Sequence, residues 1–364
     1  MFVRMQRAHV AKGALIAVSF ALFSLLVGCR SVVSVPEGDT EASASSASLR
    51  QQLVIIVHGD ANYLYHGDEG APHRADEETL REAFAAARSM PRTELFVVHQ
   101  RPADSFLGLV PRDDGTLYHF RRGRLLHQTT YEQDRSAPLA TEAQWIQRHR
   151  AAVDSSARTA VLYYGHAIPE QSRPGYHRSR PGLAFGIDGL VRGLSPLAGP
   201  GDSMLDAVVL STCDGGTPHT VAALSGHARH LLAAPNDLHL SFIDADLLAS
   251  LAPESETATW MRRLAAGAFE RLSERTVTAV GLATYDLDRA GPIARRLARQ
   301  VPSDTTAAPS GGRTLDCRRV LGTAVDTMGV RTWYRPARFG PRADRESHSG
   351  WGCLPASSRN QDDP

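Results

Sequence analysis

Short, uninterrupted apolar runs recur along this chain and constrain its fold more than any other feature. The clearest runs are LVIIVH, ELFVVH, TAVLYYG and DAVVLSTC at residues 53–58, 94–99, 159–165 and 206–213, with weaker runs at 230–234 and 277–285. Runs that are apolar throughout are typical of strands covered on both faces. Amphipathic stretches with a helical period lie between them, as at 77–90 and 256–274. The pattern predicts an α/β fold with a mostly parallel sheet flanked by helices on both faces.

Two segments depart from this alternation. At residues 113–131, two Gly-containing turns border β-prone runs, which predicts an antiparallel hairpin. After residue 300 the chain becomes rich in Pro, Ser, Thr and Gly, as a linker would be. We therefore place the main domain at 51–300 and a linker with a C-terminal extension at 301–364.

The N-terminus has the pattern of a secretion signal. Basic residues precede the apolar run at 14–27, which is short for a membrane span. The run ends in Leu-Val-Gly-Cys and resembles a bacterial lipobox, in which the cysteine is lipidated and the signal is cut before it. We predict a lipoprotein signal peptide at 1–28, lipidation of Cys29 and a flexible tether over 29–50. Arg30 favours the outer membrane of the bacterial envelope by analogy. An ordinary signal peptide or short anchor is the alternative.

Composition excludes several function classes. Forty basic residues balance 39 acidic ones, so the net charge of +1 predicts no nucleic-acid partner. The chain has no His-Glu-x-x-His, no Cys-x-x-Cys, no Walker loop and no dinucleotide fingerprint. We therefore expect neither a metal site nor a bound cofactor.

The four cysteines are too few for a disulfide scaffold. With Cys29 assigned to lipid and Cys213 to the strand-end argument below, Cys317 and Cys353 remain. In an oxidising compartment these two are expected to form a disulfide, and two free thiols are the alternative.

Two strand ends carry chemistry-bearing side chains. His166 follows one apolar run, and Cys213 ends another and precedes Gly215 and Gly216. In an open α/β sheet, residues beyond the carboxyl ends of strands face a crevice, so the two side chains can meet there. A thiolate attacks, an imidazole supplies a proton, and a tight glycine turn lets amides face an oxyanion. A structural cysteine packed beside a structural histidine is the alternative.

The stretch 160–234 resembles the clostripain-like cysteine peptidases, relatives of caspases and gingipains with the caspase-haemoglobinase fold. In those proteins one apolar strand ends in His-Gly and a later one in Asp-x-Cys. The surrounding order of strands and helices extends the resemblance over about 53–300, so 51–300 would be a caspase-like peptidase domain.

Carried over residue by residue, the resemblance implies that Cys213 is the nucleophile and His166 protonates the leaving amine. The amides of Ala167 and Cys213 would hold the oxyanion, and a peptide or protein would be hydrolysed through a thioester. Some family members use calcium, and no calcium-loop pattern occurs here.

Two departures from the family pattern affect these expectations. Ala167 replaces the glycine that usually follows the catalytic histidine. Ser211 replaces the acid that commonly lies two residues before the cysteine and selects basic side chains. Asp237, in a later loop, would then supply the charge of the specificity pocket.

Two other functions remain open. The departures at Ala167 and Ser211 allow a catalytically weak or inactive envelope lipoprotein that binds peptides or a protein partner. An α/β-hydrolase with a cysteine nucleophile is a further alternative, since LVIIVHG at 53–59 resembles an oxyanion-loop strand and 211–215 resembles a nucleophile elbow. In that fold, however, the essential histidine follows the nucleophile, whereas His166 precedes it.

Overall fold

The computed structural model describes most of the chain beyond the predicted tether. The described residues are 48–67, 70–102, 105–106, 110–111, 115–134, 137–153, 156–198, 204–301, 314–340 and 347–354. The predicted signal peptide, Cys29 and nearly all of the tether lie outside them, as does most of the predicted linker. Among the residues described, no helix combines the length and apolar character needed to cross a membrane.

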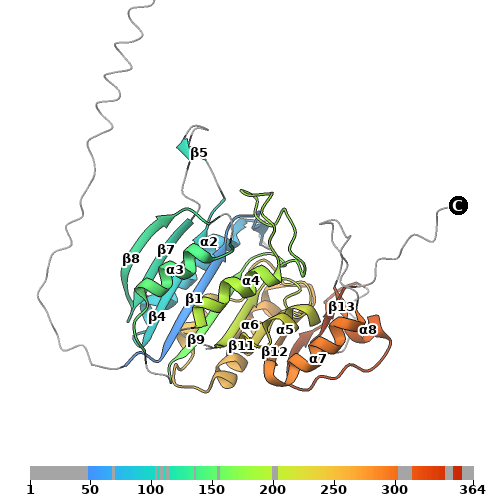
Figure 1. Ribbon diagram of the computed structural model, residues 1–364. Coiled ribbons are helices and arrows are strands. Elements are labelled where there is room, and N and C mark those ends of the chain that lie inside the picture. Colours follow the sequence, from blue (N-terminus) through green and yellow to red (C-terminus); the bar gives the residue numbers. More distant parts are fainter. Residues whose placement is uncertain are drawn as a thin grey trace, which may run out of the picture. The chain divides into compact units, whose positions relative to one another are not determined.

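Within the described residues, a nine-stranded sheet forms the centre of the structure (Figure 1), in the order β14-β12-β11-β10-β9-β1-β4-β7-β8. Its strands are β1 (Gln51–His58), β4 (Thr93–Gln100), β7 (Gly115–Arg121), β8 (Arg124–Tyr131), β9 (Arg158–Tyr164), β10 (Leu205–Ser211), β11 (Ala228–Ala233), β12 (Val280–Asp286) and β14 (Val330–Arg335). The strands from β11 to β4 run parallel, and antiparallel strands extend both edges. The α/β fold class is confirmed, and the sheet is mixed, with its parallel part in the middle.

Helices cover both faces of this sheet (Figure 1). One face carries α3 (Ala140–His149), α4 (Ile187–Leu194), α5 (Pro218–Leu224) and α7 (Leu287–Gln300). The other carries α2 (Ala75–Ser89), the 3₁₀ helix η2 (Ala245–Ser250) and α6 (Thr257–Arg275). Successive residues of β1 alternate between the two cores, Val54 and Ile56 on one side and Leu53 and Ile55 on the other. This two-sided burial explains why residues 53–57 of the strand are all apolar.

The remaining elements are short. They are the paired strands β2 (Leu64–His66) and β3 (Pro72–Arg74), β5 (Ser105–Phe106) and β6 (Val110–Pro111), β13 (Leu315–Asp316) and β15 (Gly352–Cys353), the 3₁₀ helix η1 (Ser195–Ala198) and the helix α8 (Cys317–Leu321). Each strand predicted from an apolar run is present, with ends shifted by a few residues. The predicted hairpin is also confirmed, because β7 and β8 pair antiparallel.

Residues after the predicted linker contribute to the main sheet. Strand β14 pairs with β12 and forms one edge of the sheet. Further along, Trp351 is completely buried in the core beside Tyr285, with ring centroids 5.4 Å apart. A disulfide joins Cys317 to Cys353, whose Cα atoms are 4.8 Å apart. The described part of the extension is therefore packed into the same core as the α/β domain.

Candidate active site

The ends of β9 and β10 bring the two predicted catalytic residues to the same edge of the sheet. These strands are parallel neighbours, and Tyr164 pairs with Ser211 at their carboxyl ends. His166 and Cys213 each lie two residues beyond this pair. The amide of Gly165 still donates to the carbonyl of Ser211 at 3.3 Å, so the strands remain adjacent past their last pair. Because parallel strands lie about 4.8 Å apart, the two residues leave the sheet from neighbouring points.

Aromatic packing from the loop after β1 holds His166. Its ring stacks on Tyr63, with centroids 4.5 Å apart and planes 14° from parallel. Its Nε2 lies 3.1 Å from the carbonyl oxygen of Asn62, and its amide donates to the hydroxyl of Tyr63 at 3.3 Å. Burial lowers the pKa of His166, and the bond to Asn62 opposes this. The ring is therefore neutral at pH 7, with a proton on Nε2 facing Asn62 and Nδ1 left as the acceptor.

Backbone groups of a different loop hold Cys213. Its Sγ donates to the carbonyl of Leu238 at 3.4 Å and accepts from the amide of Leu238 at 3.2 Å. Burial raises the pKa of this thiol to about 11, and Asp214 and Asp237 add to the effect while the amide of Leu238 opposes it. The side chain is half-buried, and it is the only free cysteine in the described part of the chain. The nucleophile candidate is therefore a protonated thiol at neutral pH.

His166 and Cys213 are held separately. Over the residues that the structure describes, no hydrogen bond links the two side chains. The histidine contacts the β1 loop and the cysteine contacts the loop after β11. This is a resting arrangement, in which the groups share an edge of the sheet without forming an ion pair.

The turn after Cys213 depends on Asp214 for its backbone shape. Asp214 has a φ of +57°, in the left-handed region that aspartate tolerates better than most residues. Gly215 and Gly216 do not have positive φ; they make room for close packing instead. A Cβ at Gly216 would lie 2.9 Å from the Cα of Pro235 and would also clash with the hydroxyl of Tyr285. The sequence predicted that the glycines give the turn its backbone conformation, whereas the residue with a positive φ in this turn is Asp214.

The predicted oxyanion donors are backbone amides at the same edge. Among the described residues, the amide of Ala167 has no hydrogen-bond acceptor. Ala167 also lacks a positive φ, so its side chain introduces no backbone strain where the family has glycine. The amide of Cys213 lies at the start of the turn. Both amides are therefore compatible with the oxyanion role that the sequence implied.

The two specificity candidates occupy different environments. Ser211 is completely buried, and its hydroxyl accepts from the amide of Ile243 at 2.9 Å. Asp237 is exposed and lines a small pocket with Leu238 and Thr276. Ser211 is therefore closed off from solvent, whereas Asp237 lies at the surface.

A larger cavity of about 460 Å³ lies beside the loop that contacts Cys213. His239, which follows Leu238, lines this cavity and packs edge-on against Tyr65 at 5.3 Å. Acidic and basic side chains both line it: Glu78 and Glu82 on one hand, Arg81 and Arg275 on the other. The other lining residues are Tyr65, His66, Gly67, His73, His239 and Ser241. Burial raises the pKa of Glu82 to about 7, with Asp244 adding to the effect.

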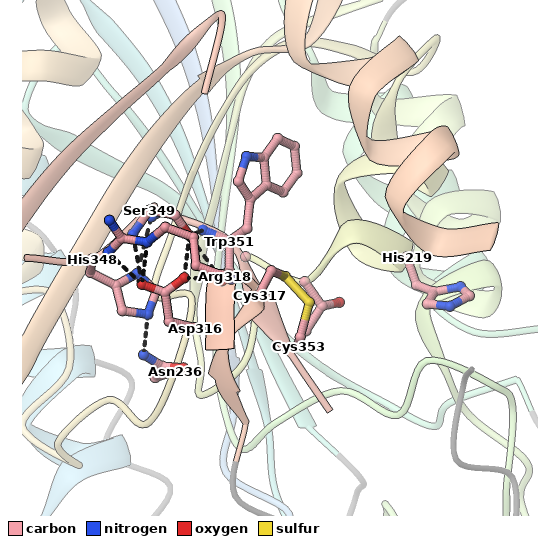
Figure 2. Close-up of a disulfide and its surroundings, with 12 residues drawn as sticks. His219, Asn236, Asp316, Cys317, Arg318, His348, Ser349, Trp351 and Cys353 are labelled. Atoms are coloured by element: carbon pink, nitrogen blue, oxygen red, sulfur yellow. Dashed lines mark hydrogen bonds and ion pairs between the residues drawn. A yellow bond between two sulfur atoms is a disulfide. The ribbon is translucent and has the colours of Figure 1, made fainter. Parts of the chain in front are cut away.

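The C-terminal segment supports the cysteine side of the site. The amide of Gly352 donates to the carbonyl of Gly216 at 3.2 Å, directly beyond the turn. His348 is hydrogen-bonded to the side-chain amide of Asn236 at 2.7 Å, in the loop that precedes Leu238 (Figure 2). Figure 2 also shows Asp316 holding Arg318 and Ser349 next to the disulfide. No motif in the sequence pointed to these contacts.

Sequence reasoning also missed residues behind His166. His58, the last residue of β1, has its Nδ1 2.8 Å from the hydroxyl of Tyr63 and its Nε2 3.2 Å from Nδ1 of His177. Burial lowers the pKa of His58 well below its usual value, and His177 and His166 add to this. The position of His58 at the carboxyl end of a parallel strand was a usable signal, because such ends face the crevice.

Comparisons with known proteins identify the fold. No family model and no curated protein matches the chain. Among solved structures, an inactive zymogen C11 protease from Parabacteroides distasonis matches 86% of this chain and 94% of its own, with a TM-score of 0.57 at 13% identity. A secreted C11 cysteine protease from Bacteroides thetaiotaomicron, in complex with an irreversible peptide inhibitor, matches 69% of each chain with a TM-score of 0.51 at 12% identity. The structure of a secreted C11 cysteine protease from the same organism, called iotapain, covers 70% of this chain and 69% of its own, with a TM-score of 0.50 at 10% identity.

These matches show that the chain has the caspase-like α/β fold of C11, or clostripain-like, cysteine proteases. The resemblance stated from the sequence is confirmed for the fold. The α/β-hydrolase alternative is not supported, because the matching structures have the other fold.

Proposed function

We propose that this chain is a cysteine endopeptidase that cleaves peptide bonds through a thioester on Cys213, with His166 as the proton donor. The observation that carries the proposal is the shared register of β9 and β10, which sets both residues two positions beyond one strand pair. The fold supports it, since similar structures are C11 cysteine proteases. A peptide inhibitor bound to one of those proteins supports a peptide or protein substrate.

The chemistry follows from the protonation states at rest. A neutral His166 accepts the proton of the Cys213 thiol, and the sulfur attacks the scissile carbonyl carbon. The amides of Ala167 and Cys213 stabilise the oxyanion that forms. His166 then gives its proton to the leaving amine as the C–N bond breaks, which leaves a thioester. Water hydrolyses the thioester and returns the thiol.

Substrate binding has to release the thiol before this reaction can start. At rest Sγ exchanges two hydrogen bonds with the backbone of Leu238. These two bonds hold Sγ on the backbone of Leu238, and burial keeps the thiol protonated. We expect a bound peptide to displace the Leu238 contact and bring Sγ toward the imidazole.

The test uses residues 30–364 as an unacylated protein and a peptide library varied at the cleaved position, with and without calcium. Cys213→Ala and His166→Ala should each lower cleavage by at least about a thousandfold, as in other nucleophile–base pairs. His230→Ala, which changes a half-buried histidine on β11, is the matched control and should retain activity. Equal activity of Cys213→Ala and wild type would refute the proposal.

One observation favours a second candidate, a peptide-binding protein with little or no catalysis. The thiol pKa of about 11 is the opposite of the low pKa expected for an activated cysteine. Alkylation of Cys213 by iodoacetamide at pH 7, with and without peptide, separates the two. A peptidase predicts that a bound peptide accelerates alkylation. Peptide binding that leaves the thiol unreactive and the peptide uncut supports the binding protein.

The proposed location is the bacterial cell envelope, with the chain attached to the outer membrane through lipid on Cys29. The lipobox-like sequence before Cys29 supports this location. Expression of the whole chain in a Gram-negative host, followed by membrane fractionation and mass measurement, tests it. Cys29→Ala should remove the lipid mass and release the protein from the membrane fraction. A wild-type mass without lipid would contradict the proposal.

A further inference from the structure

Three buried side chains with metal-binding atoms meet behind His166. His58 ends β1, Asp60 follows it, and His177 comes from the loop between β9 and α4. One ligand atom from each lies within 4.8 Å of the other two. His58 and His177 have their facing nitrogens 3.2 Å apart, and Nδ1 of His177 is 3.7 Å from Oδ2 of Asp60.

These separations suit a tetrahedral ion better than a hydrogen-bonded chain. Zinc binds imidazole nitrogen at about 2.0–2.1 Å, so two nitrogens on one ion lie roughly 3.3 Å apart, close to the observed 3.2 Å. The 3.7 Å gap between His177 and Asp60 is too long for a hydrogen bond. A relay through the three residues is therefore broken at that gap, whereas an ion placed between them would contact all three after a small shift of the carboxylate.

The burial of the three side chains also favours a bound cation. The exposed fractions of His58, Asp60 and His177 are 1%, 1% and 4%. A carboxylate removed from water needs a compensating charge, and a divalent cation supplies one. Imidazole with carboxylate is a donor set typical of zinc and neighbouring transition ions, while calcium and magnesium prefer oxygen.

The atoms behind the ligands are arranged as they are around bound metals. The second ring nitrogen of His58 is hydrogen-bonded to Tyr63 at 2.8 Å, and the ring stacks on Tyr176 at 4.6 Å. The carboxylate of Asp60 accepts from the amide of Ser179 at 2.9 Å and from its hydroxyl. Such outer contacts fix the orientation of ligand side chains and keep their free lone pairs directed at one point.

We propose that His58, Asp60 and His177 form a binding site for a divalent transition-metal ion, with zinc as the preferred ion and water as a fourth ligand. The ion would tie the end of β1 to the loop after β9. Through Tyr63, which contacts both His58 and His166, it would also fix the position of the proposed catalytic histidine. The site does not depend on the proposed peptidase activity, because none of its residues contacts Cys213.

The metal is measured directly. The tag-free protein from residue 30 onward, in wild-type and Cys213→Ala forms, is dialysed against Zn²⁺ and then metal-free buffer, and its metal content is determined by mass spectrometry. We expect one equivalent of zinc in both forms, removable by a chelator with a fall in melting temperature. Co²⁺ should give the visible absorption bands of a four-coordinate ion. A folded protein that retains no metal would overturn the proposal.

Variants identify the ligands. Asp60→Asn and His177→Gln should each weaken zinc binding by at least tenfold in a competition titration. Asp60→Asn can still accept from the amide of Ser179 and can donate to its hydroxyl, so its fold should be preserved, which circular dichroism checks. His219→Gln is the matched control, since His219 also lies beside a carboxylate, 3.8 Å from Glu170, and should bind as wild type does. Unchanged affinity in both ligand variants would overturn the assignment.

Discussion

The ends of β9 and β10 are adjacent and in register, yet the structure holds the residues that follow them in opposite ways. On the β9 side, side chains from a neighbouring strand's loop position His166, with Tyr63 as the main contact. On the β10 side, the backbone of Leu238 positions Cys213, and the C-terminal segment supports the surrounding loops.

The difference shows which half of the site is able to change. An aromatic stack with a buried hydrogen-bond network behind it keeps one ring orientation. Two backbone hydrogen bonds to a thiol are weak and can exchange for a substrate. We therefore expect His166 to keep its position and the loops around Cys213 to rearrange when substrate binds. The disulfide should limit how far these loops move.

The largest effect should come from removing the buried indole on the cysteine side. Trp351→Ala leaves a cavity beside Tyr285 and should cost about 3–5 kcal/mol of unfolding free energy. Chemical denaturation measures this loss, and Cys213 should become more accessible to thiol reagents. Trp333→Ala, in the half-buried edge strand β14, is the control and should cost less. Equal losses would show that the C-terminal segment does not specifically support this side.

The second-largest loss of unfolding free energy should come from removing the disulfide. The bond closes a segment with a sequence separation of 36, and its loss by the double change Cys317→Ser and Cys353→Ser should cost about 3–4 kcal/mol. Denaturation of the variant and of reduced wild-type protein should give the same loss. The stack of His166 on Tyr63 should be unaffected, as judged from the imidazole NMR signals. A changed His166 signal would mean that the two sides are coupled.

A pH-dependent effect tests the turn itself. Burial raises the pKa of Asp214 from 3.8 to about 6, the nearby Thr314 opposes this, and the charges of Asp237 and Glu170 add to it. Between about pH 4 and 6 the folded protein holds a proton that the unfolded chain has lost, so stability falls as pH rises through this window. Asparagine does not ionise, so Asp214→Asn removes this pH-dependent loss of stability. The variant should be more stable than wild type by up to about 3 kcal/mol at pH 7.5, with little change at pH 4. Asparagine also tolerates the positive φ.

Denaturant unfolding at both pH values measures this effect. Asp188→Asn, an exposed change on α4, is the control and should alter the pH profile little. A gain for Asp214→Asn that is equal at pH 4 and pH 7.5 would argue against burial of the carboxylate as its cause.

The smallest effect should come from the histidine side. Tyr63→Phe keeps the stack on His166 but removes the hydroxyl that bonds to His58 and to the amide of His166. We expect a loss of about 1–2 kcal/mol in stability. The pH profile of cleavage should shift as well, because the ring of His166 is held less firmly. Tyr65→Phe, whose hydroxyl donates to Glu78 away from His166, should leave the profile unchanged.

Much of the parallel centre was predictable from local sequence. Apolar runs indicated the strands because the middle of a strand buried on both faces is apolar, with buried polar residues such as Gln51 and Glu94 near the strand ends. The placement of His166 and Cys213 at strand ends was also visible, since it depends only on where each run stops. By contrast, β14 was not predicted, because it is a half-buried edge strand whose sequence lacks an apolar run and follows a linker-like segment.

The details of the site were beyond local patterns for a similar reason. His58 and His177 are 119 positions apart, and Cys213 and Leu238 are 25 apart. Spacing rules for metal or catalytic motifs search short windows, so such pairs leave no signature. The role given to Gly215 and Gly216 in the turn depended on backbone conformation, whereas the structure requires them for packing: Gly216 packs against Pro235, and Gly215 against Ala233 and Leu210.

By itself, the sequence determined the element types, the two-sided core and the chemistry available at two strand ends, because burial period and strand termination are local properties of the chain. The tertiary structure decided the pairing of β9 with β10 and the hydrogen bonds between the Cys213 thiol and the backbone of Leu238. It also decided the meeting of His58, Asp60 and His177, and the support of the Cys213 turn by the C-terminal segment. These features depend on which distant segments pack together, and close packing selects that arrangement only when the whole chain is folded.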